Sequence, residues 1–243
     1  MLLHVYNIPV AIGDVPIVLL SVEELKKTAE DHIAELKKSI EHVTSGKLKI
    51  YTETRLGNVI DELQDVCKKI HPFAVVMGTT GTSGVERTLF GSNTLTAIRH
   101  LTSPVICVPR GKEYGQGIHK IGLACDFREV ATTTPTREIV SFVNEFKAKL
   151  FVLNVDYDNR QFKPDTPEQS AILHEALEPV QPSYHFITRH DIEDGINDFA
   201  ESHNLDLVIA IPKKHKLLEG LFKKSSTRQL VFESHVPVMC VHE

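Results

Sequence analysis

The stretch FAVVMGTTGTSGVERTLFGSNTLTAIRHLTSPVICVP, residues 73–109, decides the fold because its order is that of a strand, a glycine loop, a helix and a second strand. The apolar run Phe73–Met77 is short, continuous and partly β-branched, which is typical of a strand covered on both faces in a parallel sheet. Small residues at 91–94 open the helical pattern, and Pro104 ends it before the strand Val105–Val108. The unpaired N–H groups of such a helix start attract anions.

The spacing of the glycines carries a family resemblance. It consists of Gly78, two residues, Gly81, nine residues, and then Gly91 with Ser92. This pattern, followed by a short helix and a Pro-Val-hydrophobic strand, closely resembles the ATP-binding loop of the universal stress protein family. The alternative interpretation is a glycine-rich turn between a strand and a helix that holds no ligand.

The resemblance implies an adenine-nucleotide site in the first half of the chain. The ligand would be ATP or another adenine nucleotide, with or without Mg²⁺, and Val5 would meet the adenine through its backbone. The residues implied to contact the phosphates and the ribose are Gly78, Thr80, Gly81, Gly91, Ser92 and Asn93. The chemistry agrees with this, because the N–H groups of a glycine loop and the positive end of a helix both favour a polyanion.

Composition narrows the class of protein. The 243 residues carry a net charge of -5, whereas a nucleic-acid-binding surface needs a basic face, so we expect no nucleic-acid partner. No apolar run approaches the roughly 20 residues of a membrane span, and the start lacks the features of a signal peptide, so we expect no membrane partner and a cytoplasmic location. The 4 cysteines show no C-x-x-C spacing and are predicted to be buried, reduced thiols. No metal-ligand spacing occurs among the histidines, and no metal site is predicted.

The first half of the chain alternates predicted strands and helices. Strands are expected at 2–6 and 47–54, and helices at 21–43 and 58–70. The first helix opens with a capping box formed by Ser21 and Glu24. Its predicted apolar stripe, with spacings of three and four, consists of Leu25, Ala29, Ile33, Leu36, Ile40 and Val43.

A second copy of the same order follows a polar, glycine-rich linker at about residues 110–119. Its strands are expected at 120–126, 149–156, 183–188, 205–211 and 237–241, and its helices at 132–147, 165–179, 191–203 and 226–234. An offset near 132 places Phe73–Gly78 on Leu205–Ala210. The predicted fold class is therefore α/β: two tandem doubly wound parallel-sheet domains of the Rossmann-like, adenine nucleotide α-hydrolase-like kind. The predicted domains are residues 1–110 and 119–243, which resemble a tandem universal stress protein arranged as an internal pseudo-dimer.

The second copy has lost the glycines of the loop. Four larger residues stand where the first copy has Gly78, Gly81, Gly91 and Ser92; they are Ala210, Lys213, Lys223 and Lys224. A phosphate-binding loop needs a bare backbone, so this loop is predicted not to hold a triphosphate. Its lysines either attract an anion more loosely or simply face water.

The first copy lacks its initial strand–helix unit, about thirty residues long. In the family this strand is central, in the order 3-2-1-4-5, and its terminal Asp contacts the nucleoside. The corresponding residue of the second copy is Asp126, which with Val155 is a candidate remnant of a second site; alternatively, Asp126 caps the following helix. Three explanations of the gap stay open: a start upstream of Met1, a rearranged sheet, or strand exchange with another chain.

The resemblance leads to a functional hypothesis, a non-catalytic, ATP-binding regulatory protein of the stress response. One alternative is a nucleotide-free dimerisation or protein-interaction scaffold, and another is a slow ATPase or phosphoryl-transfer enzyme. The loop lacks a G-K-[ST] lysine and an evident general base, which argues against the enzyme. Partners are expected to be copies of the same domain, paired through residues 104–108 and 237–241 within the chain, and a homo-oligomer would use another face.

Overall fold

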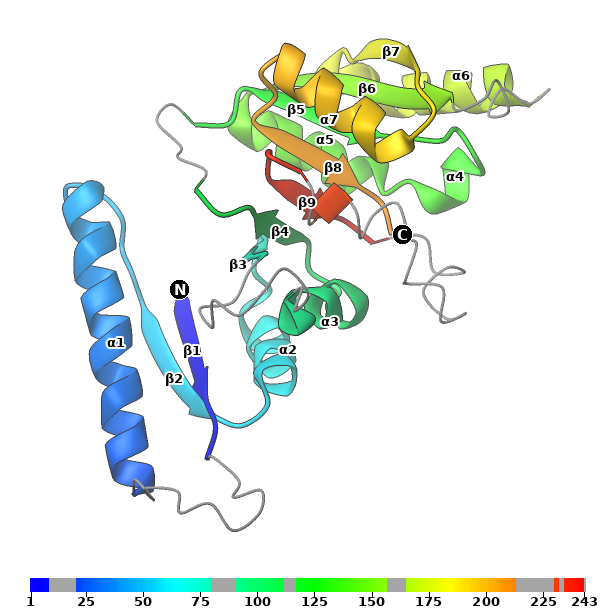
Figure 1. Cartoon of the computed structure of the whole chain (residues 1–243). Coiled ribbons are helices and arrows are strands. Elements are labelled where there is room, and N and C mark those ends of the chain that lie inside the picture. Colours follow the sequence, from blue (N-terminus) through cyan, green and yellow to red (C-terminus); the bar gives the residue numbers. More distant parts are fainter. Residues whose placement is uncertain are drawn as a thin grey trace. The chain divides into compact units, whose positions relative to one another are not determined.

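The computed structural model describes residues 1–8, 21–79, 91–111, 117–156, 165–212, 230–231 and 234–242. These residues form two compact units, Met1–His71 and Pro72–Glu243, each of which is described by itself (Figure 1). Most of the glycine loop (80–90), the lysine-rich segment (213–229) and therefore most of the helix predicted at 226–234 lie outside the described residues.

The first unit is a two-stranded parallel sheet with two helices. Its elements are β1 (Leu2–Tyr6), α1 (Val22–Val43), β2 (Thr52–Leu56) and α2 (Val59–Ile70). The register places Leu2 opposite Thr52 and Tyr6 opposite Leu56. The strand predicted at 47–54 therefore begins and ends later in the chain, while the predicted helices agree with the structure to within one residue.

Helix α1 begins as predicted. The Ser21 hydroxyl accepts a hydrogen bond from the Glu24 amide at 3.2 Å, and the Glu24 carboxylate accepts one from the Ser21 amide at 2.7 Å, which confirms the capping box. The predicted apolar stripe is only partly covered, because Ala29 and Ile33 are buried but Leu36 is 51% exposed. The sheet beneath α1 has two strands and is too narrow to cover the whole stripe.

A charge network joins β2 to α2. The Arg55 guanidinium donates to Glu53 at 2.6 Å, to Glu62 at 3.0 Å and to Asp65 at 2.6 Å. The Lys69 ammonium also donates to the Asp65 carboxylate, at 2.8 Å. Several charges in one network hold their geometry better than an isolated surface pair, so this network fixes α2 against the end of β2.

The Asp65 carboxylate gives the first unit a pH dependence. Hydrogen bonds from Lys69 and Arg55 lower the pKa of Asp65 from 3.8 to about 2. Because the folded-state pKa is depressed, the stabilisation is present above about pH 4 and is lost as the pH falls through about 2. We expect amide hydrogen exchange in α2 to accelerate over this interval. The variant Asp65→Asn should lose that step, and a variant whose pH profile matches the wild type would contradict the assignment.

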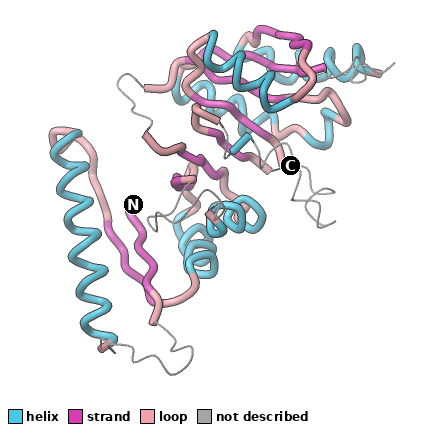
Figure 2. Tube along the Cα trace, in the orientation of Figure 1, coloured by secondary structure: helices cyan, strands magenta, loops and turns pink. Residues whose placement is uncertain are grey.

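The second unit is built on a seven-stranded sheet in the order β3-β4-β9-β8-β5-β6-β7. Figure 2 shows the strands in magenta and the helices in cyan. Its strands are β3 (Val75–Gly78), β4 (Val105–Val108), β5 (Lys120–Ala124), β6 (Lys149–Asp156), β7 (Ser183–Thr188), β8 (Leu207–Ala210) and β9 (Val238–Cys240). Its helices are α3 (Ser92–His100), α4 (Val130–Thr133), α5 (Thr136–Phe146), α6 (Thr166–Leu177), η1 (Glu178–Val180) and α7 (Ile192–Ser202). The strands β7-β6-β5-β8-β9 give the second copy the predicted order 3-2-1-4-5.

Helices cover both faces of the second copy's sheet (Figure 1). Leu150 and Val152 of β6 pack in one core with residues of α5 and α6, whereas Val155 of the same strand lies against Gly195 of α7. Alternate side chains of a strand point to opposite faces, so the α/β, doubly wound prediction is confirmed. The helix predicted at 132–147 is interrupted at Pro135, because the residue before a proline is driven out of the helical region.

The two copies meet at an antiparallel pair of strands. Ile106 of β4 lies opposite Met239 of β9, and these strands are the predicted last strands of their copies. Pairing within one chain is therefore confirmed. The contacts between residues place β3, α3 and β4 in the same compact unit as the second copy. The predicted domains 1–110 and 119–243 instead divide the chain at the boundary between the two sequence repeats, and they remain a prediction.

The strand pairing corrects the repeat alignment by one residue. Gly78 lies opposite Val108 in the β3–β4 pair, whereas Ala210 lies opposite Cys240 in the β8–β9 pair. Val75 pairs with Val105, and Val208 pairs with Val238, so the two copies are offset by 133 residues at these strands, not by 132. The residue that corresponds to Gly78 is therefore Ile211. The substitution of the first loop glycine by a larger residue still holds.

The 4 cysteines form no disulfide, as predicted; three of them are buried, as predicted, whereas Cys125 is half-buried. Across the described ranges, no helix combines the length and the apolar character that crossing a membrane requires.

Candidate functional site

The end of β3 and the start of α3 are held together by two threonines. The Thr94 hydroxyl, in the first turn of α3, donates to the Gly78 carbonyl at 2.9 Å. The Gly91 amide donates to the Thr79 carbonyl at 3.4 Å. Thr79 and Thr94 are 4% and 2% exposed, so both hydrogen bonds lie in protected surroundings. The two ends of the glycine loop are thus fixed side by side.

Gly91 is the N-cap of α3, and only glycine fits there without displacement. A Cβ at this position would lie 3.1 Å from the Thr79 carbonyl oxygen and 3.1 Å from the Thr94 hydroxyl. Among the residues that the structure describes, no side chain accepts a hydrogen bond at this cap. The next two residues, Ser92 and Asn93, are exposed. The start of α3 therefore presents the positive end of the helix, with a hydroxyl and an amide side chain, to solvent.

Four of the predicted site residues are brought together here, namely Gly78, Gly91, Ser92 and Asn93. Thr80 and Gly81 lie outside the described residues. Val5 is half-buried on β1, where its register partner is Arg55, and belongs to the other compact unit. The roles of these three residues stay predictions.

The sequence-based prediction missed the structural roles of Thr79 and Thr94. A signal for Thr94 was present, because a threonine side chain near the start of a helix often hydrogen-bonds a backbone group. Its acceptor, 16 residues earlier in the chain, could not be read from this signal.

The second copy offers a different surface. The Asp126 carboxylate accepts a hydrogen bond from the Arg128 amide at 3.2 Å, and the Arg128 guanidinium lies 3.9 Å from it. The alternative in which Asp126 caps the next helix is wrong, because the N-cap of α4 is Glu129. Val155 is 6% exposed and packs against α7, so its side chain serves the core.

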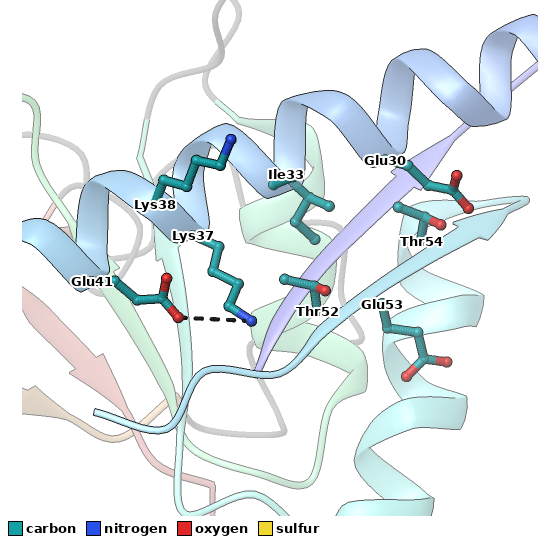
Figure 3. A pocket seen from close by; sticks show the side chains of 9 residues that line it. Glu30, Ile33, Lys37, Lys38, Glu41, Thr52, Glu53 and Thr54 are labelled. Atoms are coloured by element: carbon teal, nitrogen blue, oxygen red, sulfur yellow. Dashed lines mark ion pairs between the residues drawn. The ribbon is translucent and has the colours of Figure 1, made fainter. Parts of the chain in front are cut away.

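Metal ligation is not suggested by the described part of the chain, where no group of three or more His, Cys, Asp or Glu residues has a suitable arrangement. A groove of about 550 Å³ lies between α1 and β2 in the first unit (Figure 3). Lys37 in this groove is paired with Glu41 at 3.7 Å. Three glutamates face two lysines in its lining, so its charge does not favour a polyanion. The lining residues are Glu30, Ile33, Ala34, Lys37, Lys38, Glu41, Thr52, Glu53 and Thr54.

The fold is a doubled α/β fold in which the start of a helix, preceded by glycine, lies at the carboxyl end of a parallel strand, the place where open α/β sheets generally hold their ligands. The model of the universal stress protein family matches residues 1–109 and again residues 117–242. The chain therefore belongs to the universal stress protein family, with two copies of its domain.

Similar proteins come from archaea and bacteria. A universal stress protein of Methanocaldococcus jannaschii is 33% identical over 91 residues, which are 37% of this chain and 52% of that protein, so the match spans about half of the relative's length. The crystal structure of a universal stress protein from Archaeoglobus fulgidus has a TM-score of 0.73 at 18% identity, over 98% of this chain and 85% of that one. A protein of unknown function from Pseudomonas aeruginosa has a TM-score of 0.65 at 11% identity, over 99% and 92% of the two chains. These structural matches establish the shared fold.

Proposed function

We propose that the chain is a non-catalytic regulatory protein of the stress response that binds ATP or another adenine nucleotide, with or without Mg²⁺, at the end of β3 and the start of α3. The observation that carries the proposal is the contact of Thr94 with the Gly78 carbonyl, which sets the start of α3 beside the end of β3. A phosphate bound there would accept hydrogen bonds from backbone N–H groups and would also lie at the positive end of the helix dipole.

One nucleotide per chain is proposed. In the second copy, β8 ends at Ala210 and is followed by Ile211, and lysines replace the later glycines in the sequence. A phosphate needs bare backbone at these positions. Asp126 keeps the place of the nucleoside-contacting residue, but its carboxylate is engaged by the turn at Arg128.

Titration calorimetry of the full chain with ATP, in the presence and absence of Mg²⁺, tests the proposal. We expect one site per chain in the wild type and no binding by Gly91→Lys, since the new side chain would crowd the Thr79 carbonyl and fill the approach to the helix start. Circular dichroism melting of the variant checks that α3 is still folded. Absence of heat with the wild-type chain would instead favour the nucleotide-free scaffold.

The remaining parts of the proposal follow from the same assignment. A regulatory protein that binds cellular ATP would act in the cytoplasm. Its outer faces would contact other copies of the chain and form a homo-oligomer. Turnover of ATP that disappears in Gly91→Lys would replace the regulatory role by the enzyme alternative.

A further inference from the structure

Aromatic rings join the C-terminal end of helix α7 to the sheet of the second copy (Figure 1). The His185 ring of β7 lies 4.8 Å from the Phe199 ring of α7 and 5.7 Å from the Phe151 ring of β6, measured between ring centroids. His203 directly follows α7, and its ring stacks on Phe199 at 3.8 Å and lies 5.9 Å from His185. Two imidazole and two phenyl rings therefore hold this end of the helix.

His185 is poorly placed to carry a charge. Its half-buried ring contacts two phenyl rings, and its Nε2 atom lies 3.3 Å from the Ser183 hydroxyl. Burial, followed by the nearby His203, lowers the pKa of His185 from its ordinary value of 6.5. A positive charge on His203 alone would suit the C-terminal end of a helix, so His185 is the sensitive member of the pair.

Cationic side chains of two neighbouring strands lie around this end of α7. The Lys120 ammonium of β5 donates to the His203 carbonyl at 2.8 Å. Lys149 lies on the same face of β6 as Phe151, because alternate residues of a strand share a face. A charge on His185 would therefore add to positive charges already present, which disfavours it.

The carboxylates of this part of α7 are engaged with other side chains. The Glu201 carboxylate lies 3.8 Å from His235, and the Asp198 carboxylate accepts a hydrogen bond from the Arg189 guanidinium at 2.7 Å. Neither contact supplies a counter-charge for an imidazolium at His185.

The other end of α7 is fixed by a group that stays charged in weak acid. The Asp191 carboxylate accepts hydrogen bonds from the Glu193 amide at 2.9 Å and the Asp194 amide at 3.0 Å. The Glu193 side chain and these two amides lower the pKa of Asp191 from its ordinary value of 3.8. The cap therefore persists between about pH 7 and about pH 5, the interval in which His185 is challenged by protons.

We propose that the contacts of His185 with Phe199 and Phe151 form a latch that opens in mild acid and releases the C-terminal half of α7, while the Asp191 cap keeps the N-terminal half in place. The released segment would uncover Phe151 and Phe199, two apolar rings that the closed latch covers. Because the folded-state pKa of His185 is depressed, the latch has its full stability above about pH 6.5 and loses it as the pH falls through the lower folded-state value. The inference does not depend on nucleotide binding.

Amide hydrogen exchange of the full chain at about pH 7.5 and about pH 5, corrected for the intrinsic pH dependence of exchange, tests the latch. The His203 and Leu205 amides donate to carbonyls of the last two turns of α7, and the Gly195 amide donates to the Asp191 carbonyl. We expect exchange at His203 and Leu205 to become about threefold faster or more in acid, with no change at Gly195. Equal acceleration at all three amides would mean that the whole helix unfolds, and would overturn the proposal.

Variants of two histidines complete the test. His185→Phe keeps a ring between Phe151 and Phe199 but cannot be protonated, so we expect the acid step to disappear. His185→Gln is smaller and also uncharged, and it should give the same result if the phenyl ring fits poorly. His174→Phe is the matched control, because His174 also lies beside an aromatic ring, that of Tyr184 at 5.7 Å, but belongs to α6. An acid step that persists in both His185 variants, or that is lost in His174→Phe, would overturn the proposal.

Discussion

Replacing Ser92 by aspartate is expected to reduce the affinity of the chain for ATP by about 100-fold, which corresponds to about 2.7 kcal/mol. Ser92 is the first residue of α3 and is exposed, and none of the described side chains caps the helix in front of it. A carboxylate here would occupy the positive end of the helix and repel a triphosphate. Two unit charges about 4 Å apart interact by about 4 kcal/mol at the effective dielectric of a protein surface, so the expected loss is well within the available repulsion.

Ser92→Asp is expected to lower the affinity for ATP but not the stability of α3, so it separates an effect on binding from an effect on folding. An acidic residue in the first turn stabilises a helix by about 0.3–1 kcal/mol, so Ser92→Asp should melt at the wild-type temperature or slightly above it. Ser92→Ala is the matched control, because it removes the hydroxyl without adding charge and should cost about tenfold or less in affinity. Calorimetric titration with ATP measures both variants. Equal affinity of Ser92→Asp and wild type would place the nucleotide elsewhere.

Elements whose ends are set by local chemistry could be predicted closely from the sequence. The Ser21–Glu24 capping box and the start of a strand directly after Pro104 each involve residues a few positions apart, and the structure contains both features. The sheet order of the second copy followed from strand–helix alternation and the family resemblance. Local signals and family pattern agreed in these regions, so a single arrangement was favoured.

The neighbours of β3 could not be predicted in the same way. A continuous apolar run is typical of a strand covered on both faces, yet Val76 is largely exposed. The hydrophobic pattern of a strand indicates that its side chains suit a buried position. It contains no information on whether the neighbouring element that would bury them is present. The same holds for Leu36 on α1, which the stripe placed in a core and the structure leaves half exposed.

The contacts at the candidate site also could not be predicted from the sequence. The hydrogen bond from Thr94 to Gly78 depends on how an intervening loop closes, and no spacing rule specifies that. The one-residue error in the repeat alignment has a similar origin, because the register of a strand is set by its ladder of hydrogen bonds with a neighbour and by the faces of its side chains. Family resemblance located the site, and the tertiary structure defined its geometry.

A matched pair of lysine substitutions should separate the two copies by their stability. Ile209→Lys places an ammonium group at a fully buried position of β8, between β5 and β9. An unpaired buried charge is among the changes that exceed about 4 kcal/mol, a large part of the roughly 5–15 kcal/mol that stabilises a domain. We expect this variant to lose the cooperative unfolding transition of the second unit, or to unfold at much lower urea concentration.

Val76→Lys, at the equivalent position of β3, should behave in the opposite way. Its side chain is 66% exposed, and surface substitutions usually change stability by no more than about 0.5 kcal/mol, so its urea midpoint should match that of the wild type. Urea unfolding of both variants, followed by far-ultraviolet circular dichroism at several protein concentrations, measures the contrast. A loss above about 2 kcal/mol in Val76→Lys would mean that β3 is already covered in the purified protein, because lysine is costly at this position only where a neighbour excludes water.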